Sequence, residues 1–186
     1  LSLSLYEETD LNKAEKLKIY TTNLNGEDEP TKGKVTMYSL KQPTRSFRER
    51  LWAEPDKKLI AKDEYYKLFP YDKHADETNK YKWDRDKQVA EFSFDTKTLK
   101  EIDWTSNIKS MKPGVYVLEA VCKDKFGEEV KDIRYVTLYN TAVDDVPENE
   151  VDWFKAVSAT VEPGEKASFI QASDLKGLNY KLDIEH

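Results

Sequence analysis

Alternating apolar and polar positions mark about seven short strands in the first 140 residues. Residues 1–5 alternate strictly between leucine and serine, and residues 34–40 place Val35 and Met37 on one face and Thr36 and Tyr38 on the other. An alternation with a period of two is typical of half-buried strands, and turn residues separate most of these segments. The further segments that we expect to be strands are residues 17–21, 89–94, 99–104, 115–123 and 130–139.

The segment from Pro113 to Tyr139 is the clearest element of this pattern. Pro113-Gly114 opens an apolar strand, Asp124-Lys125-Phe126-Gly127 forms a turn, and a second strand follows. Such a hairpin is typical of the last two strands of an immunoglobulin-like sandwich. The sequence therefore predicts an all-β fold, an immunoglobulin-like β-sandwich formed by residues 1–143.

Residues 41–87 interrupt the strand pattern, because ordinary connections have only about 4–6 residues. Asp63 is expected to cap a short helix that has Tyr65 and Phe69 on one face and ends before Pro70. Eight aromatic residues predict that this insertion is ordered and partly helical: Phe47, Trp52, Tyr65, Tyr66, Phe69, Tyr71, Tyr81 and Trp83.

An acidic linker, residues 144–152, follows the sandwich, and a new strand pattern begins at Trp153. We expect strands at residues 153–159, 166–172 and 178–184, the opening part of a second module, residues 153–186. Three strands are too few for a closed sandwich, and a small isolated sheet is marginally stable. The incomplete module is therefore expected to pack on the first domain, pair with another copy, or be loosely ordered.

The charge and hydropathy of the chain limit the classes of partner that we expect it to bind. The formal net charge of −6 disfavours nucleic acid as the main partner, because phosphate binding needs a basic field. No apolar run reaches the roughly 18 residues of a membrane span, so we expect no membrane insertion. A signal peptide is not visible, and the chain is expected to be a fragment of a longer protein.

The sequence offers little for catalysis. Cys122 is the only cysteine, so neither an internal disulfide nor a cysteine-based zinc site is expected, and its place in an alternating strand predicts burial. Neither His74 nor His186 lies in a motif that would supply a base. With no phosphate loop, nucleophile elbow or zinc helix, we expect no enzyme activity, cofactor or metal.

Calcium at the acidic linker is a second possibility for residues 144–152. Five acidic residues stand there without a base, but their spacing does not match an EF-hand loop. A solvated linker is the favoured interpretation, and calcium is left open.

A basic and aromatic patch in the insertion is the candidate contact surface. Arginines beside aromatic rings can stack on bases and pair with phosphates, but the overall charge opposes nucleic acid, and we expect the insertion to pack on the sandwich. If the patch is exposed, it suits protein binding, because Trp, Tyr and Arg dominate interface hot spots. Alternatively, aromatic residues exposed in one plane would suit a sugar-binding surface. The candidate residues are Arg45, Phe47, Arg48, Arg50, Trp52, Tyr65 and Tyr66.

Three short motifs are distinctive: residues 160–167 read Thr-Val-Glu-Pro-Gly-Glu-Lys-Ala, residues 111–116 read Met-Lys-Pro-Gly-Val-Tyr, and residues 120–127 read Ala-Val-Cys-Lys-Asp-Lys-Phe-Gly. The first resembles the opening of a macroglobulin-type domain of the alpha-2-macroglobulin family, and the other two also fit this family. Residues 38–52 are similar to bacterial members, particularly those of Bacteroidetes. Together these motifs extend over most of the chain.

The resemblance implies a structural segment of a protease inhibitor that entraps proteases. It implies the cell envelope of a Gram-negative bacterium, periplasmic or anchored to the outer membrane, with proteases as partners of the full-length parent and with neighbouring domains of the same chain as contacts. The family's Cys-x-Glu-Gln thioester is not carried over, because Lys123-Asp124-Lys125 follows Cys122. The alternative is a carbohydrate- or protein-binding β-sandwich module of an adhesin-like surface protein.

Overall fold

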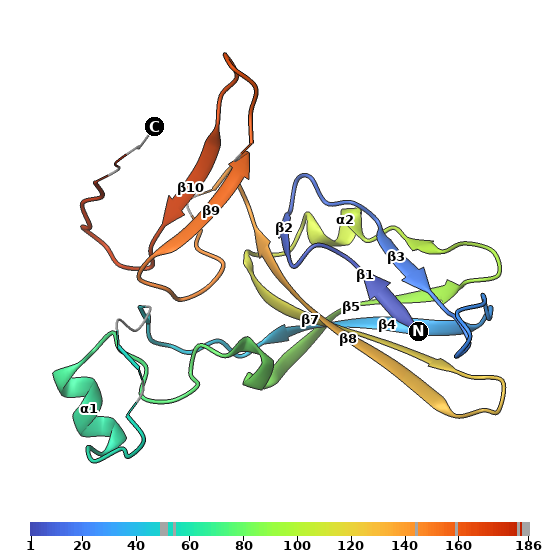
Figure 1. Ribbon diagram of the computed structural model, residues 1–186, viewed down its shortest axis with the longest axis horizontal. Coiled ribbons are helices and arrows are strands. Elements are labelled where there is room, and N and C mark those ends of the chain that lie inside the picture. Colours follow the sequence, from blue (N-terminus) through green and yellow to red (C-terminus); the bar gives the residue numbers. More distant parts are fainter. Residues whose placement is uncertain (49–51, 54, 144, 159, 182, 184–186) are drawn as a thin grey trace. The chain divides into compact units, whose positions relative to one another are not determined.

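The computed structural model describes residues 1–48, 52–53, 55–143, 145–158, 160–181 and 183 (Figure 1). The chain is mostly β, with 40% strand and 8% helix, which confirms the predicted all-β sandwich class. It consists of two compact units. Unit 1 comprises residues 1–42 and 79–148, and unit 2 comprises residues 43–78 and 149–186.

A five-stranded sheet is the larger layer of unit 1. Its strand order is β2-β8-β7-β4-β5, and every neighbouring pair is antiparallel except the parallel pair of β2 and β8. The hairpin expected from the Pro113–Tyr139 pattern is confirmed as β7 and β8. The strands are β2 (Glu8–Asp10), β4 (Lys32–Leu40), β5 (Arg85–Asp95), β7 (Gly114–Lys123) and β8 (Glu129–Tyr139).

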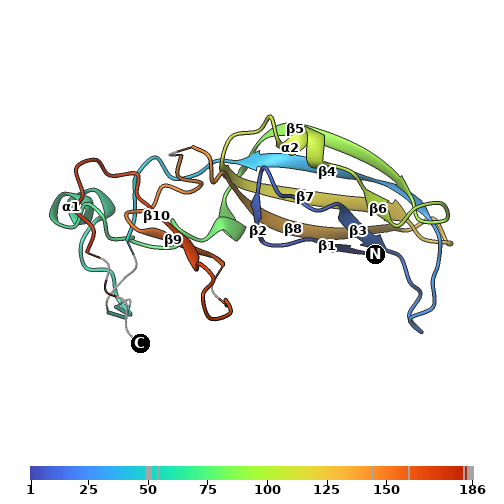
Figure 2. The same ribbon diagram turned by 90° about the horizontal axis from the view of Figure 1, so that it is seen from above.

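A three-stranded antiparallel sheet in the order β1-β3-β6 lies along one face of the larger sheet (Figure 2). Its strands are β1 (Ser2–Ser4), β3 (Leu17–Tyr20) and β6 (Glu101–Ile102), and α2 (Thr105–Ile108) follows β6. The strand expected over residues 99–104 is thus shorter, because Trp104 already leads into a helical turn. β2 was not expected, since Glu-Thr-Asp has no apolar alternation.

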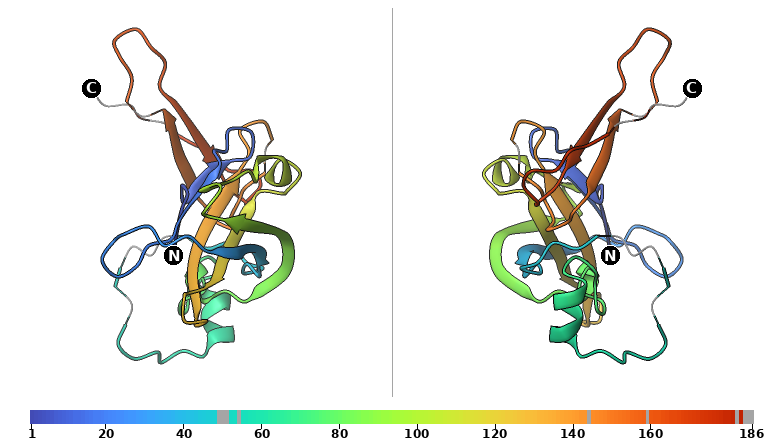
Figure 3. Two further views of the ribbon diagram at one scale, coloured as in Figure 1. Left: turned by 90° about the vertical axis from the view of Figure 1, so that its right-hand side faces the viewer. Right: turned by 90° about the vertical axis from the view of Figure 1, so that its left-hand side faces the viewer.

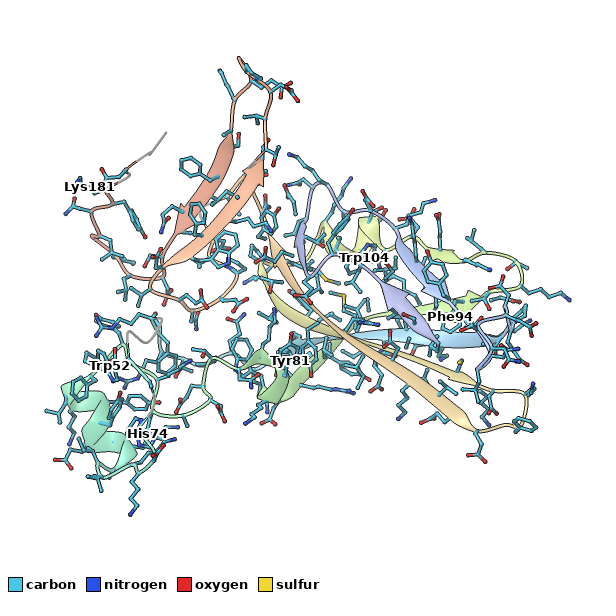
Figure 4. All side chains as sticks on the ribbon, viewed as in Figure 1. Trp52, His74, Tyr81, Phe94, Trp104 and Lys181 are labelled. Atoms are coloured by element: carbon cyan, nitrogen blue, oxygen red, sulfur yellow. The ribbon has the colours of Figure 1, made fainter. Side chains whose placement is uncertain are left out.

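The core of unit 1 lies between these two sheets. Val35, Met37 and Leu118 from the large sheet meet Leu17 and Ile19 from the small one, and all five are fully buried. Close packing of this kind is the main source of a sandwich's stability. Figure 4 shows the side chains of this core, with Phe94 and Trp104 labelled.

Trp104 and Cys122 belong to the same core. Trp104 is 1% exposed, and its indole Nε1 donates a 2.6 Å hydrogen bond to the Glu15 carbonyl oxygen, so the ring's single polar group is paired. Cys122 is 6% exposed, which confirms its predicted burial, and burial raises the pKa of its thiol.

Gly33 permits the close packing of β4 in the middle of the large sheet. A Cβ atom at this position would lie 2.3 Å from the Val121 carbonyl oxygen and 2.4 Å from the Phe94 ring. No side chain fits that space, so glycine is required by steric contact with the neighbouring strand.

Unit 2 contains α1 (Lys62–Leu68) and the antiparallel pair of β9 (Trp153–Ser158) and β10 (Ser168–Ala172) (Figure 3). The helix and the first two strands expected after residue 152 are confirmed. The short 3₁₀ helix η1 (Lys80–Lys82), which was not expected, belongs to unit 1.

Two expectations for unit 2 are wrong. Asp63 does not cap α1: the N-cap is Ala61, and Asp63 stands in the first turn, where its charge favours the helix dipole. Residues 178–181 and 183 form no strand, and residues 182 and 184 lie outside the described residues. Leu178 and Tyr180 are 42% and 53% exposed, so this alternation has no buried face to fix it in a sheet.

The insertion packs on the sandwich only in its last part. Tyr81 meets the Tyr135 ring at 4.8 Å, and Trp83 packs against a buried apolar cluster of the large sheet. Residues 43–78, in contrast to the expectation, group with residues 149–186 and not with the sandwich strands. The predicted domain boundaries at residues 143 and 153, including the incomplete second domain, stay predictions.

Candidate functional site

The predicted contact residues are all in the part of the sequence that belongs to unit 2. Arg45, Phe47, Tyr65 and Tyr66 lie close together, whereas Arg48 pairs elsewhere in the same unit. Trp52 is 50% exposed, and Arg50 lies outside the described residues. We call Arg45, Phe47, Tyr65, Tyr66 and His74 the aromatic cluster.

Helix α1 places the two tyrosines of the aromatic cluster. Asp63 and Glu64 in its first turn and Lys67 in its last turn complement the helix dipole, and the backbone ends its helical path at Phe69, before Pro70. Tyr65 packs on Phe69, four residues later, with ring centroids 5.1 Å apart.

The rings of the aromatic cluster are turned against one another. The Tyr65 and Tyr66 rings are 6.1 Å apart at 68°, and those of Phe47 and Tyr66 are 6.1 Å apart at 48°. His74, labelled in Figure 4, meets Tyr65 edge-on at 5.3 Å. Edge-on and tilted contacts are preferred between packed aromatic side chains, whereas a sugar platform needs rings that share a plane.

The Glu77 carboxylate connects Tyr66 of the aromatic cluster to Lys62, the first residue of α1. Its Oε1 accepts a hydrogen bond from the Tyr66 hydroxyl at 2.7 Å and pairs with Lys62 Nζ at 3.0 Å, and its Oε2 accepts the Ala75 backbone N–H at 2.6 Å. Partial burial works against the charged form, but these donors together outweigh it and lower the pKa of Glu77 from 4.5 to about 2. Burial, with the bond to Glu77, raises the pKa of Tyr66.

Two arginines of the predicted contact surface, Arg45 and Arg48, are described by the structure, and both have partners inside unit 2. The Arg45 guanidinium lies 4.4 Å from the centre of the Tyr66 ring, and its Nη1 donates to the Pro70 carbonyl oxygen at 3.2 Å. Arg48 Nε donates to Asp72 Oδ1 at 2.6 Å, and this partner raises the pKa of Arg48. Both cations therefore hold parts of the insertion together.

Asp72 is the buried end of that ion pair. The residue is 2% exposed, and its Oδ2 atom has no hydrogen-bond partner among the described residues. Short backbone contacts fix its surroundings: Arg48 forms a parallel bridge with Asp72, and the Arg48 N–H donates to the Tyr71 carbonyl oxygen at 2.9 Å.

The insertion is also bonded to the segment that begins at residue 149. The Phe47 N–H donates to the Asn149 carbonyl oxygen at 3.2 Å, and the Val151 N–H donates to the Phe47 carbonyl oxygen at 2.9 Å. The Ser46 hydroxyl donates to Asp174 Oδ2 at 2.5 Å. These long-range bonds explain why the insertion groups with residues 149–186, and the sequence carries no local signal for them.

A small hollow of about 230 Å³ opens beside the aromatic cluster. Leu59, Ile60, Tyr65 and His74 contribute to its walls, and His74 Nε2 lies 3.3 Å from the Ile60 carbonyl oxygen. Leu59 is 90% exposed. Sequence reasoning missed His74 and Leu59 as neighbours of the patch, because their approach depends on the paths of the loops before and after α1.

Two acidic residues of the predicted linker have side-chain partners. Glu148 Oε1 accepts the Thr137 hydroxyl at 3.0 Å, and Asp152 accepts from the Gln171 side chain. Asp144 lies outside the described residues. Among the residues that the structure describes, no group of three or more His, Cys, Asp or Glu side chains is placed to hold a metal ion. The calcium hypothesis stays untested.

None of the helices that the structure describes has the length and apolar composition needed to cross a membrane. The family models contain no match to this chain, and searches of curated proteins and of solved structures find no significant match either.

Proposed function

We propose that this chain is a structural segment of an alpha-2-macroglobulin-like protein of the bacterial cell envelope that inhibits proteases by entrapping them. The proposal takes both the family and the scaffold role from the resemblance of the motifs in residues 111–127 and 160–167, and the packing of unit 2 supports the scaffold role. It names no reactive group in this chain.

The internal pairing of the aromatic cluster is the observation that supports a scaffold role best. Arg45 rests on Tyr66, Arg48 is bonded to Asp72, and the rings meet at steep angles instead of facing solvent in one plane. A surface that is built to bind usually leaves such hot-spot side chains open to a partner. Here they brace the insertion against itself and against residues 149–174.

A binding module of an adhesin-like protein is the second candidate. The half-exposed Trp52 and the 41% exposed Tyr71 are the observations in its favour, because exposed aromatic rings can stack on sugars or fill a partner's pocket.

A glycan array and a stability assay on the same variants distinguish the two candidates. In the scaffold case, the chain binds no glycan, and replacing Arg45 and Tyr66 with alanine loosens unit 2. In the adhesin case, the chain retains a glycan, and Trp52→Ala and Tyr71→Ala abolish this binding while the fold stays intact. Ser2→Ala in unit 1 is the control for both assays.

A further inference from the structure

Asn25-Gly26 is the single Asn-Gly pair of the sequence, and it lies in the loop between β3 and β4. This loop projects away from both sheets of unit 1 (Figure 2). Asparagine is among the thermolabile residues, and glycine, which has no side chain, leaves its own backbone nitrogen open to the side chain before it. The pair therefore combines the two groups that a spontaneous reaction of the main chain requires.

The surroundings of the pair are open. Asn25 is exposed, and its side-chain amide has no hydrogen-bond partner among the residues that the structure describes. Gly26 is exposed as well, and a Cβ atom built on it would meet nothing within 4 Å beyond its chain neighbours. The Asn25 side chain can thus turn toward the Gly26 nitrogen without displacing another residue.

The reaction that this arrangement allows needs only water. The Gly26 backbone nitrogen loses its proton and attacks Asn25 Cγ, so that a new N–Cγ bond closes a five-membered imide while the Cγ–Nδ2 bond breaks and ammonia leaves. Water then opens the imide at one of its two carbonyl carbons. Opening at Cγ gives aspartate, and opening at the backbone carbonyl carbon gives isoaspartate, in which the main chain runs through Cβ and Cγ.

Hydrogen bonds within the loop oppose this reaction. Asn23 Oδ1 accepts the backbone N–H groups of Asn25 at 2.9 Å and Glu27 at 3.0 Å. The Gly26 N–H donates to the Asn23 carbonyl oxygen at 3.1 Å, so the attacking nitrogen is engaged while the loop stays closed. The attack therefore requires local opening, and the bonds of the Asn23 side chain determine how often the loop opens.

Asn23 lies in the same loop and is held much more firmly. Its Oδ1 accepts two backbone N–H groups, and its Nδ2 donates to Glu27 Oε2 at 2.9 Å. Leu24 follows it, and the side chain of a leucine hinders approach to its backbone nitrogen. The two asparagines of this loop should therefore differ in reactivity, and each serves as the reference for the other.

We propose that Asn25 is a site of spontaneous deamidation and that the Asn23 side chain controls its rate. The product places a new carboxylate just before the acidic run Glu27-Asp28-Glu29, where like charges repel. In the isoaspartate form the main chain gains one carbon atom, so Asn23 Oδ1 loses the spacing of the two N–H groups that it accepts. The modification changes the charge and the shape of the loop, and it does not depend on the proposed function.

Peptide mapping of the folded 186-residue chain after incubation at mildly alkaline pH tests the proposal. The tryptic peptide of residues 19–32 contains Asn23 and Asn25 as its only asparagines, so fragmentation in a mass spectrometer assigns the change to one of them. Labelling with an isoaspartyl methyltransferase detects the isoaspartate product. Conversion is expected at Asn25 well before Asn23, and Asn25→Gln should abolish both signals.

Asn23→Ala tests the control of the rate. This variant should convert Asn25 about tenfold faster in the folded chain, because two hydrogen bonds that hold the loop closed are lost. Asn140→Ala is the matched control: Asn140 Oδ1 also accepts two hydrogen bonds, but in another loop of unit 1, and its loss should leave the rate at Asn25 unchanged. In urea, where the loop bonds are absent, all three chains should convert Asn25 at one rate.

Hydrogen exchange on the converted protein supplies a second measurement. The Glu27 amide should exchange faster than before conversion, and the Leu118 amide in the core should exchange as before. Persistence of Asn25 in the folded chain after the unfolded chain has converted overturns the proposed site, and so does equal conversion of Asn23 and Asn25. Equal rates for the wild type and Asn23→Ala in the folded state overturn the control by Asn23.

Discussion

Replacing Glu77 by Gln tests whether the aromatic cluster braces unit 2. The change keeps the shape of the side chain but removes the negative charge that Tyr66, Lys62 and Ala75 stabilise. It also puts an NH₂ group opposite one of these donors, so one hydrogen bond is lost.

The magnitude follows from the pKa of Glu77. A fall from 4.5 in the unfolded chain to about 2 in the folded one corresponds to about 3 kcal/mol in favour of the folded state at neutral pH. Because the Lys62 side chain is 56% exposed, solvent screens part of this, and we expect Glu77→Gln to destabilise unit 2 by about 2 kcal/mol.

The sign of the pH dependence is fixed by the lowered pKa. The contribution of Glu77 is fully present above pH 4.5 and is lost as the pH falls toward 2, because the unfolded state then binds the proton first. The difference in stability between the wild type and Glu77→Gln should therefore be largest at neutral pH and vanish near pH 2.

Urea unfolding followed by amide NMR measures each unit separately. Signals of Ala75 and Val151 report unit 2, and the signal of Leu118 reports unit 1. Glu77→Gln should lower the urea midpoint of Ala75 and Val151 and leave that of Leu118 unchanged. Glu162→Gln, the same substitution at an exposed loop position of unit 2, is the control. Equal effects of the two variants, or a difference that persists at pH 2, would refute the bracing role of Glu77.

Three other predictions concern the packing and the exposed loop. Gly33→Ala should destabilise unit 1 strongly or prevent its folding, as circular dichroism melting would show, because its Cβ would lie 2.3 Å from the Val121 carbonyl oxygen; normal melting would contradict this. Trp104→Ala should lower the free energy of unfolding, measured with urea, by about 4 kcal/mol, because it leaves a core cavity and an unpaired Glu15 carbonyl. A loss below about 1 kcal/mol would contradict the place of Trp104 in the core. Brief trypsin digestion of the native chain should cut first after Lys57 or Lys58, because residues 55–61 are all exposed and irregular. The double variant Lys57→Gln/Lys58→Gln should slow that cut, and a first cut within β7 or β8 would contradict the described exposure.

The sequence predicts the sandwich well where side-chain alternation is regular. Val35 and Met37, which the alternation places on one face of their strand, are both completely buried. The hairpin turn after Lys123 lies at the Asp and Gly residues that predict it. The three residues of β2 have no apolar alternation, and they form a strand through their pairing with β8. Glu8 aligns with Thr137 in this parallel ladder, which no local sequence pattern predicts.

The candidate site was predicted only in part. Arg45, Phe47, Tyr65 and Tyr66, which were named as candidates from their residue types, do lie close together. Their bracing partners, among them Glu77 and Asp72, come from later in the insertion and are fixed by ion pairs and hydrogen bonds across many residues. Such contacts follow from the tertiary path of the chain and leave no periodic signal in the sequence.

The most direct test of the proposed protease trap uses the full-length parent protein. The parent is incubated with trypsin, and the mixture is separated by size-exclusion chromatography. Entrapment predicts that trypsin elutes with the parent and still cleaves a small peptide substrate but not a large protein. Trypsin that elutes alone and remains active on the large protein would contradict the proposed function.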